Sequence, residues 1–302
     1  MTNDTLSLLQ LSLARWCTYL GLVGLTGSII VRWLLSRNRW PQDNKSLENT
    51  HWSIAVYGAV LLVCAAGARL YAQTYSVFGL DQSVTLESLR IVGLDSRWGA
   101  RWQPHAILSL ITIISVLMAK TYPRVGWRTT GILIAALWST SPMTGHAMAF
   151  QSILPWTIQI AHGLAAGLWV GSLFVILISI TRLTTSSDGH QRLADIIQRF
   201  SLLARVSVTT LIITGALTVW FYIDTFEQLW TTSYGRMLLV KMGLVIATGG
   251  LGLYNWRWLT PQLRSDRSAG KLVQVAKLET VCALLLLAAT ALLVHLAMPH
   301  DL

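Results

Sequence analysis

The segment from residue 129 to residue 181 contains no aspartate, glutamate, lysine or arginine. A membrane-spanning helix needs about 20 mostly apolar residues, so this segment is long enough for two such helices. Pro155 lies near its middle and marks the expected hairpin between them. An average soluble domain carries about 25% charged residues, whereas this chain carries 12% and is 53% hydrophobic. These features exclude a soluble enzyme and predict an all-α, polytopic membrane protein.

Six more apolar stretches raise the predicted number of membrane-spanning helices to eight. They are residues 16–31, 52–68, 102–119, 206–223, 242–256 and 280–300. The 242–256 stretch is short and reaches full length only if the helix continues back through Lys241. No stretch of the sequence predicts a soluble domain, so we expect one integral membrane domain over residues 1–302. The longest polar interval, residues 74–101, has room for a short surface helix.

Lysine and arginine are unevenly shared between the predicted loops. Most of the 23 basic residues follow the first, third, fifth and seventh predicted helices. Loops rich in these residues stay in the cytoplasm, so both termini are expected on the outer, non-cytoplasmic side of the membrane. This distribution explains the net charge of +10 and gives no support to nucleic-acid binding. Residues 1–10 carry no basic cluster and no cleavage site, so we expect the first helix to be retained.

Short matches between the two halves of the chain suggest a four-plus-four parallel repeat. Residues 26–31 (TGSIIV) match residues 170–175 (VGSLFV), and both segments run inward in the predicted topology. Residues 146–148 (HAM) match residues 295–298 (HLAM), and both run outward. Matching directions are what a parallel repeat requires.

Histidines and methionines near the outer side are the candidate ligands of a metal site. His146 and His162 have similar predicted depths, because a short hairpin joins their helices and each residue advances 1.5 Å. Met143 lies three residues before His146 and shares its face. Imidazole and thioether together favour copper, whereas these helices contain no carboxylate that would favour magnesium or calcium. Hydrogen bonding between helices is the alternative role for each histidine.

Three more side chains near the same side complete the candidate set. The predicted copper ligands are His146, His162, His105, His295, Met143 and Met298. Residue types alone leave the copper valence open. Because neutral imidazole binds metals, affinity should fall below a pH of about 6.5.

Two further features of the predicted helices have structural explanations. Gly163, Gly167 and Gly171 recur at every fourth position, a spacing typical of tightly packed membrane helices. Lys241 lies inside a predicted helix, and its side chain is expected to extend to the membrane surface.

The sequence lacks the motifs of several other protein classes. Cys17, Cys64 and Cys282 lie in three different predicted helices, so neither a disulfide framework nor a zinc motif is expected. We find no nucleotide-binding fingerprint and no nucleophile elbow. An enzyme is therefore not predicted.

Four stretches resemble the copper-resistance D membrane proteins, the CopD and PcoD family, over nearly the whole chain. They are residues 13–16 (LARW), 144–147 (TGHA), 162–171 (HGLAAGLWVG) and 234–241 (YGRMLLVK), the last running on to Asn255. The histidines of the second and third of these stretches, His146 and His162, are the ligands that the resemblance implies. Many relatives have a histidine where this chain has Thr18, so the site here has fewer imidazoles or uses Cys17.

The resemblance implies an eight-helix inner-membrane protein that handles copper. Such a protein would move copper across the membrane or receive it from a small periplasmic carrier of the CopC type. Two other hypotheses stay open at this point. Paired membrane histidines also bind haem, which would make the chain a haem- or quinone-linked electron-transfer protein. Alternatively, the chain is a membrane scaffold that docks a periplasmic copper carrier through residues 74–101.

Overall fold

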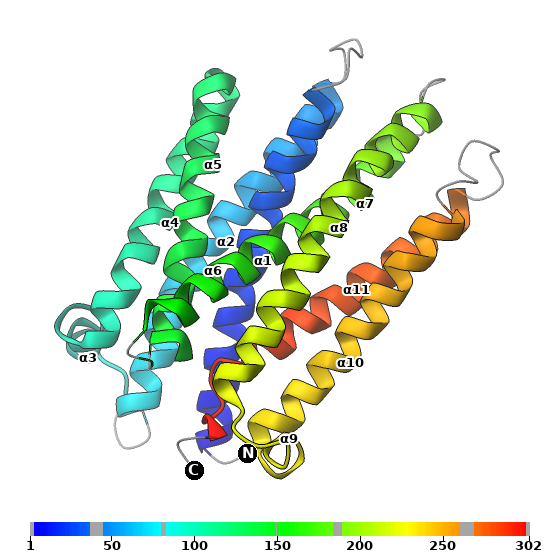
Figure 1. Ribbon diagram of the computed structural model, residues 1–302. Coiled ribbons are helices and arrows are strands. Elements are labelled where there is room, and N and C mark those ends of the chain that lie inside the picture. The colour runs from blue at the N-terminus through cyan, green and yellow to red at the C-terminus, as the bar shows by residue number, and fades with distance from the viewer. Residues whose placement is uncertain are drawn as a thin grey trace.

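The computed structural model describes residues 3–36, 45–79, 83–148, 150, 152–183, 189–259 and 269–299. Within these ranges the regular secondary structure is entirely helical. The long helices run side by side in one elongated bundle, and the chain begins and ends at the same end of it (Figure 1). The all-α class expected from the sequence is therefore confirmed.

The α-helices are α1 (Asn3–Ser36), α2 (Lys45–Phe78), α3 (Leu86–Arg90), α4 (Arg97–Thr121), α5 (Pro123–Thr140), α6 (Ile153–Ala166), α7 (Ser172–Leu183), α8 (Gly189–Tyr222), α9 (Gln228–Thr231), α10 (Ser233–Tyr254) and α11 (Ala269–Leu293). Two 3₁₀ segments follow α5, namely η2 (Ser141–Thr144) and η3 (His146–Met148). Three π-helical segments are η1 (Ile91–Asp95), η4 (Gly167–Gly171) and η5 (Asn255–Leu259).

Seven helices of the described chain are long and apolar enough to cross a membrane. They are Asp4–Ser36, Ser46–Phe78, Arg97–Thr121, Ile153–Ile180, Asp195–Tyr222, Ser233–Leu259 and Gly270–Leu293. The remaining predicted span corresponds to α5, which is 18 residues long and carries Arg124 and Arg128 in its first two turns. Those two charges make α5 less apolar than the seven, although it packs along α4.

The hairpin between the fourth and fifth predicted spans lies earlier than expected. Pro155 falls inside α6, whereas the connection comprises residues 141–152. Ser152 caps α6 by accepting a hydrogen bond from the Leu154 amide. Pro155 is therefore in the first helical turn, where a backbone N–H has no acceptor within the helix and proline is tolerated.

The last helix also begins earlier than predicted. α11 covers Ala269–Leu293, whereas the charge-free stretch had suggested residues 280–300. Lys277 and Glu279 lie within the first half of α11, so a helix in this bundle continues past charged residues. As a result, His295 lies in the turn that follows the helix, and His300 lies outside the described residues.

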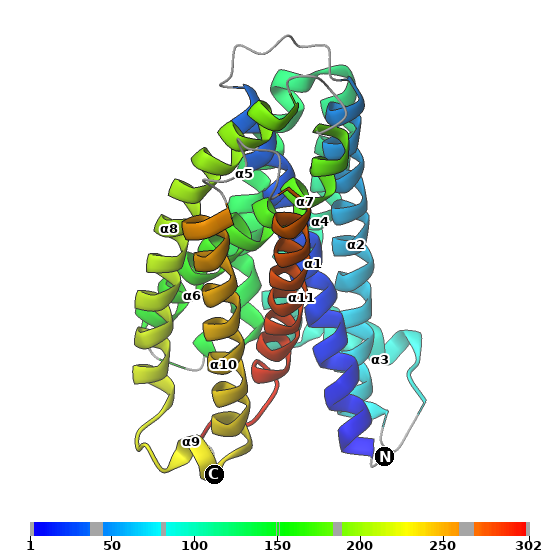
Figure 2. The same ribbon diagram turned by 90° about the vertical axis from the view of Figure 1, so that its right-hand side faces the viewer.

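The polar interval 74–101 contains the short helix that its length allowed. α3 begins with a capping box, in which Thr85 and Ser88 bond to each other's backbone amides. η1 then leads into α4, and the Gln103 amide donates to the Gly93 carbonyl at 2.9 Å. α3 and α9 lie at the same end of the bundle as the two termini (Figure 2).

The glycine stripe of the fifth predicted span makes the close helix contacts that its spacing indicated. Gly163 and Gly167 lie against the indole of Trp138, where a Cβ would come within 2.6 and 2.8 Å of ring atoms. Gly171 meets Gly27 of α1, and a Cβ on Gly27 would lie 2.0 Å from the Gly171 carbonyl oxygen. α1 thus packs backbone to backbone against η4 in the interior of the bundle.

Candidate functional site

Two buried arginines hold the turn between α5 and α6. Arg15 of α1 is 1% exposed, and Arg69 of α2 is 3% exposed. Arg15 donates from Nη1 to the Ser141 carbonyl and from Nη2 to the Thr144 carbonyl, both at 2.9 Å. Arg69 donates from Nη2 to the Thr144 hydroxyl. The turn that precedes His146 is therefore fixed to α1 and α2 by charged donors.

His105 on α4 lies beside this turn with a defined tautomer. The Thr140 hydroxyl lies 3.1 Å from the Leu137 carbonyl and 3.0 Å from His105 Nδ1. Because the hydroxyl has one proton and donates it to the carbonyl, we assign the imidazole proton to Nδ1, which leaves the lone pair on Nε2. His105 Nε2 is buried without a hydrogen-bond partner among the described residues. An imidazole in this state can bind a metal through Nε2, while the hydrogen bond from Nδ1 keeps the ring oriented.

His295 approaches the same arginines from the turn after α11. It lies within electrostatic range of Arg15, Arg69 and His146, and its Nε2 is buried without a hydrogen-bond partner in the described chain. Burial, followed by the positive charge of Arg15, lowers the pKa of His295 to about 3. The imidazole is therefore neutral, the form that binds metals, at any physiological pH.

His146 joins the cluster from η3 and is packed between aromatic rings. The Tyr222 and Tyr234 rings each lie 6.3 Å from the His146 ring, centroid to centroid, in edge-on geometry. Phe150 stacks on Tyr222 at 5.3 Å. Tyr222 of α8 and Tyr234 of α10 thus flank the His146 imidazole, which is within electrostatic range of His295.

His162 lies in a separate environment among α6, α8 and α10. The Thr214 hydroxyl donates to the Thr210 carbonyl at 2.6 Å and so accepts from His162 Nδ1 at 2.9 Å. Lys241 of α10 is within electrostatic range of His162. The similar depth predicted for His162 and His146 stays a prediction.

The two candidate methionines lie close in sequence to the clustered histidines. Met143 is half-buried in η2, and Met298 is 6% exposed beyond α11. In the described part of the chain, no three side chains among His, Cys, Asp and Glu converge on a common metal position. The Thr18 hydroxyl donates to the Ala14 carbonyl of its own helix at 3.0 Å.

Sequence reasoning missed the role of Arg15 and Arg69. Arg15 was noted only as part of residues 13–16, and Arg69 only as one of the 23 basic residues. The available signal was their position next to long apolar stretches, since an arginine within lipid needs a partner. The partners are Ser141 and Thr144, which local pattern cannot identify.

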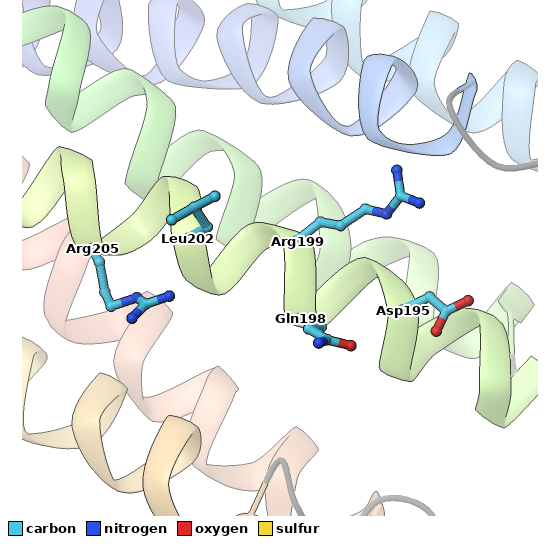
Figure 3. A pocket seen from close by; sticks show the side chains of 5 residues that line it. All are labelled: Asp195, Gln198, Arg199, Leu202 and Arg205. Carbon is cyan, nitrogen blue, oxygen red and sulfur yellow. The ribbon is translucent and has the colours of Figure 1, made fainter.

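A groove at the opposite end of the bundle has different chemistry. It is lined by Asp195, Gln198, Arg199, Leu202 and Arg205, which all project from α8 (Figure 3). Arg205 lies 5.4 Å from the centroid of the Trp256 ring. These side chains offer no imidazole or thioether, so the groove does not resemble a copper site.

Comparison with known families covers both halves of the chain. A model of the copper resistance protein D-like N-terminal domain matches residues 3–156, and a model of copper resistance protein D matches residues 194–293. The chain belongs to the copper resistance protein D family. The histidines and arginines described above therefore lie in a membrane protein of a copper-resistance family.

Two characterised relatives of the family are similar to this chain. The copper transport protein CutJ of Bacillus subtilis is 26% identical over 224 residues, which cover 72% of this chain and 40% of CutJ. The inner membrane protein YebZ of Escherichia coli is 28% identical over 208 residues, which cover 67% of this chain and 70% of YebZ. No solved structure matches significantly. With its apolar helices, this family member is a multi-pass inner-membrane protein.

Proposed function

We propose that this protein binds copper at a histidine cluster near the periplasmic face and moves it across the inner membrane or accepts it from a carrier. The observation that carries the proposal is that His105 and His295, from distant parts of the sequence, each lie within electrostatic range of Arg15 and Arg69, and that His295 is also within range of His146. Met143 and Met298 are the thioether ligands nearest in sequence. Imidazole accepts both copper valences, and thioether favours Cu(I).

His162 is proposed as a second, deeper copper position. α6 begins at Ile153, and at 1.5 Å per residue His162 lies about 14 Å further along the helix axis. Its Nδ1–H is committed to Thr214, which leaves Nε2 as the metal-binding nitrogen. Lys241 beside it is a cation that would lower the affinity for a metal, a feature suited to release rather than storage.

The proposed topology has eight membrane-spanning helices with both termini in the periplasm. α5 is the eighth span, with Arg124 and Arg128 at the cytoplasmic surface. The excess of lysine and arginine in the loops at that end supports this orientation. It places the histidine cluster on the periplasmic side, where a carrier of the CopC type would deliver copper.

Three features support the four-plus-four repeat as part of this proposal. Gly27 and Gly171, which are equivalent in the matched segments, contact each other, as residues near a pseudo-twofold axis do. α2 and α8 are each 34 residues long. α4 and α10 begin with the same cap, in which Ser96 accepts from the Gly99 amide and Thr232 accepts from the Gly235 amide.

Metal analysis of the purified protein tests the function. We expect about one or two copper ions per chain by elemental analysis after copper loading, and no Soret band in the absorption spectrum, which separates copper from haem. The double variant His105→Ala/His295→Ala should lose the outer copper. His51→Ala is the matched control, because His51 is buried at the other end of α2 against Ser179. Unchanged copper stoichiometry in both His105→Ala/His295→Ala and His146→Ala/His162→Ala would remove the assignment.

A carrier interaction is tested separately. Exposed apolar side chains lie at the end of the bundle proposed to face the periplasm. They are Leu86 of α3, Trp230 of α9 and Phe226, which precedes α9. Replacing residues 86–90 with a Gly-Ser linker should abolish copper transfer from a CopC-type carrier while leaving direct copper loading intact. Transfer at the wild-type rate would exclude α3 as the docking element.

A further inference from the structure

In the described part of the chain, no ion pair joins the buried arginines to a carboxylate. Within the described residues, the ion pairs are Arg32–Glu48 and Arg90–Glu87, and neither involves Arg15 or Arg69. Both arginines donate to the same residue, Thr144, one to its carbonyl and the other to its hydroxyl. Two full positive charges are therefore held close together inside the bundle. Buried charges normally have a partner of opposite sign, because desolvation and mutual repulsion both oppose this arrangement.

Hydrogen-bond donors of this pair are also left over. Arg15 Nε and Arg69 Nη1 are buried and have no acceptor in the described part of the chain. Unsatisfied buried donors of this kind indicate a missing ion or water. Tyr19 lies one turn after Arg15 on the same face of α1, within electrostatic range of both guanidinium groups.

A copper ion does not complete this arrangement. Two arginines repel a cation, and their N–H groups have no lone pair to offer a metal. The neutral imidazoles of His105 and His295 supply no negative charge either. What the cluster lacks is an anion with oxygen acceptors, for which guanidinium N–H groups are the best-matched donors in proteins.

We propose that Arg15 and Arg69 form a binding site for one small oxygen anion, a carboxylate or an inorganic oxyanion, held at Arg15 Nε and Arg69 Nη1. The hydrogen bonds to Ser141 and Thr144 fix the other edges of the two guanidinium groups, so the free donors are held in place before the anion binds. A carboxylate would offset one of the two positive charges, and a doubly charged phosphate would offset both. If the proposed copper function holds, the anion also lowers the repulsion that a metal ion would meet at His105 and His295.

Equilibrium dialysis of the metal-free, full-length protein in zwitterionic nanodiscs tests the site. The probes are radiolabelled acetate and, separately, radiolabelled inorganic phosphate at low ionic strength. We expect saturable binding of about one equivalent of at least one probe. Arg69→Gln and Arg15→Gln should weaken binding by about 10- to 100-fold, the range for losing a hydrogen bond to a charged group. Arg236→Gln removes an exposed arginine of α10 and should leave the affinity unchanged.

The outcomes separate this site from the copper proposal. No saturable binding of either probe, or equal binding by wild type and Arg69→Gln, overturns the anion site. Should Arg69→Gln fail to fold, Arg69→Lys keeps the charge but loses the planar fork, so several-fold weaker binding is expected and an unchanged affinity contradicts the site. Copper content measured on the same preparations is independent, since anion binding without copper would leave this site standing and remove only the metal assignment.

Discussion

At the residue scale, Thr140 determines which nitrogen of His105 is available to a metal. Its hydroxyl proton is committed to the Leu137 carbonyl, so His105 must donate from Nδ1. Thr140→Val would leave that buried N–H without an acceptor, which costs about 1–3 kcal/mol of unfolding free energy. We expect copper affinity to fall with it, whereas Thr140→Ser should retain both. Chemical unfolding in detergent and copper titration of the two variants check this, and equal behaviour would show that the hydroxyl does not orient the ring.

His295 gives a second prediction at this scale, the pH dependence of stability. Its pKa is about 3 in the folded chain and 6.5 in the unfolded chain, so between these values only the unfolded state binds the proton. Stability contributed by this group is complete above pH 6.5 and decreases as the pH falls toward 3, by about 1.4 kcal/mol per pH unit. In metal-free protein, His295→Asn should flatten the stability profile between pH 6.5 and 5. An unchanged slope would mean that His295 titrates normally.

The same pKa revises the pH dependence expected from the sequence. An unperturbed histidine would lose metal as the pH falls below about 6.5. His295 is protonated only near pH 3, so its share of copper binding should persist at pH 5.5. Copper retention at pH 5.5 in wild type and His295→Asn measures this difference.

At the element scale, the crossing of α1 and η4 depends on two glycines. A Cβ on Gly27 would overlap the backbone of Gly171, which cannot move aside as a flexible side chain can. Gly27→Ala should therefore destabilise the bundle by about 1–3 kcal/mol, as overpacking does. Gly243→Ala on α10 is the matched control, because no atom lies within 4 Å of its added Cβ. There the better helix propensity of alanine predicts a neutral or slightly stabilising change, and thermal unfolding of both variants compares them.

Local pattern predicted which elements form, and long-range contacts determined how they end. The charge-free residues 129–181 predicted helices because a backbone within lipid must satisfy its hydrogen bonds internally. It did not reveal that Pro142 and Gly145 break the chain into 3₁₀ turns after Thr140. The candidate histidines were recognised by residue type, whereas their division into an arginine-linked cluster and a separate His162 depends on contacts between residues more than 100 positions apart.

At the scale of the whole molecule, the two ends of the bundle should face different compartments. α3, α9 and both ends of the chain lie together at one end of the bundle (Figure 2). In a variant without native cysteines, a cysteine at Glu87 or Glu227 should react with a membrane-impermeant thiol reagent added outside intact spheroplasts. A cysteine at Arg128 should react only after the membrane is opened. The reverse pattern would invert the proposed topology and place the histidine cluster in the cytoplasm.

The hydrogen bond from the Arg15 side chain to the Ser141 carbonyl also affects how the chain inserts into the membrane during synthesis. The two residues are 126 positions apart. A ribosome adds about 5–20 residues per second, so α1 leaves it roughly 6–25 s before its carbonyl acceptors have been synthesised. During that interval the Arg15 guanidinium has none of its final partners, and an unpartnered arginine is costly in the hydrocarbon core. The first helix of the nascent chain must therefore keep this side chain in contact with water or headgroups, and it reaches its final depth only after α5 has been inserted.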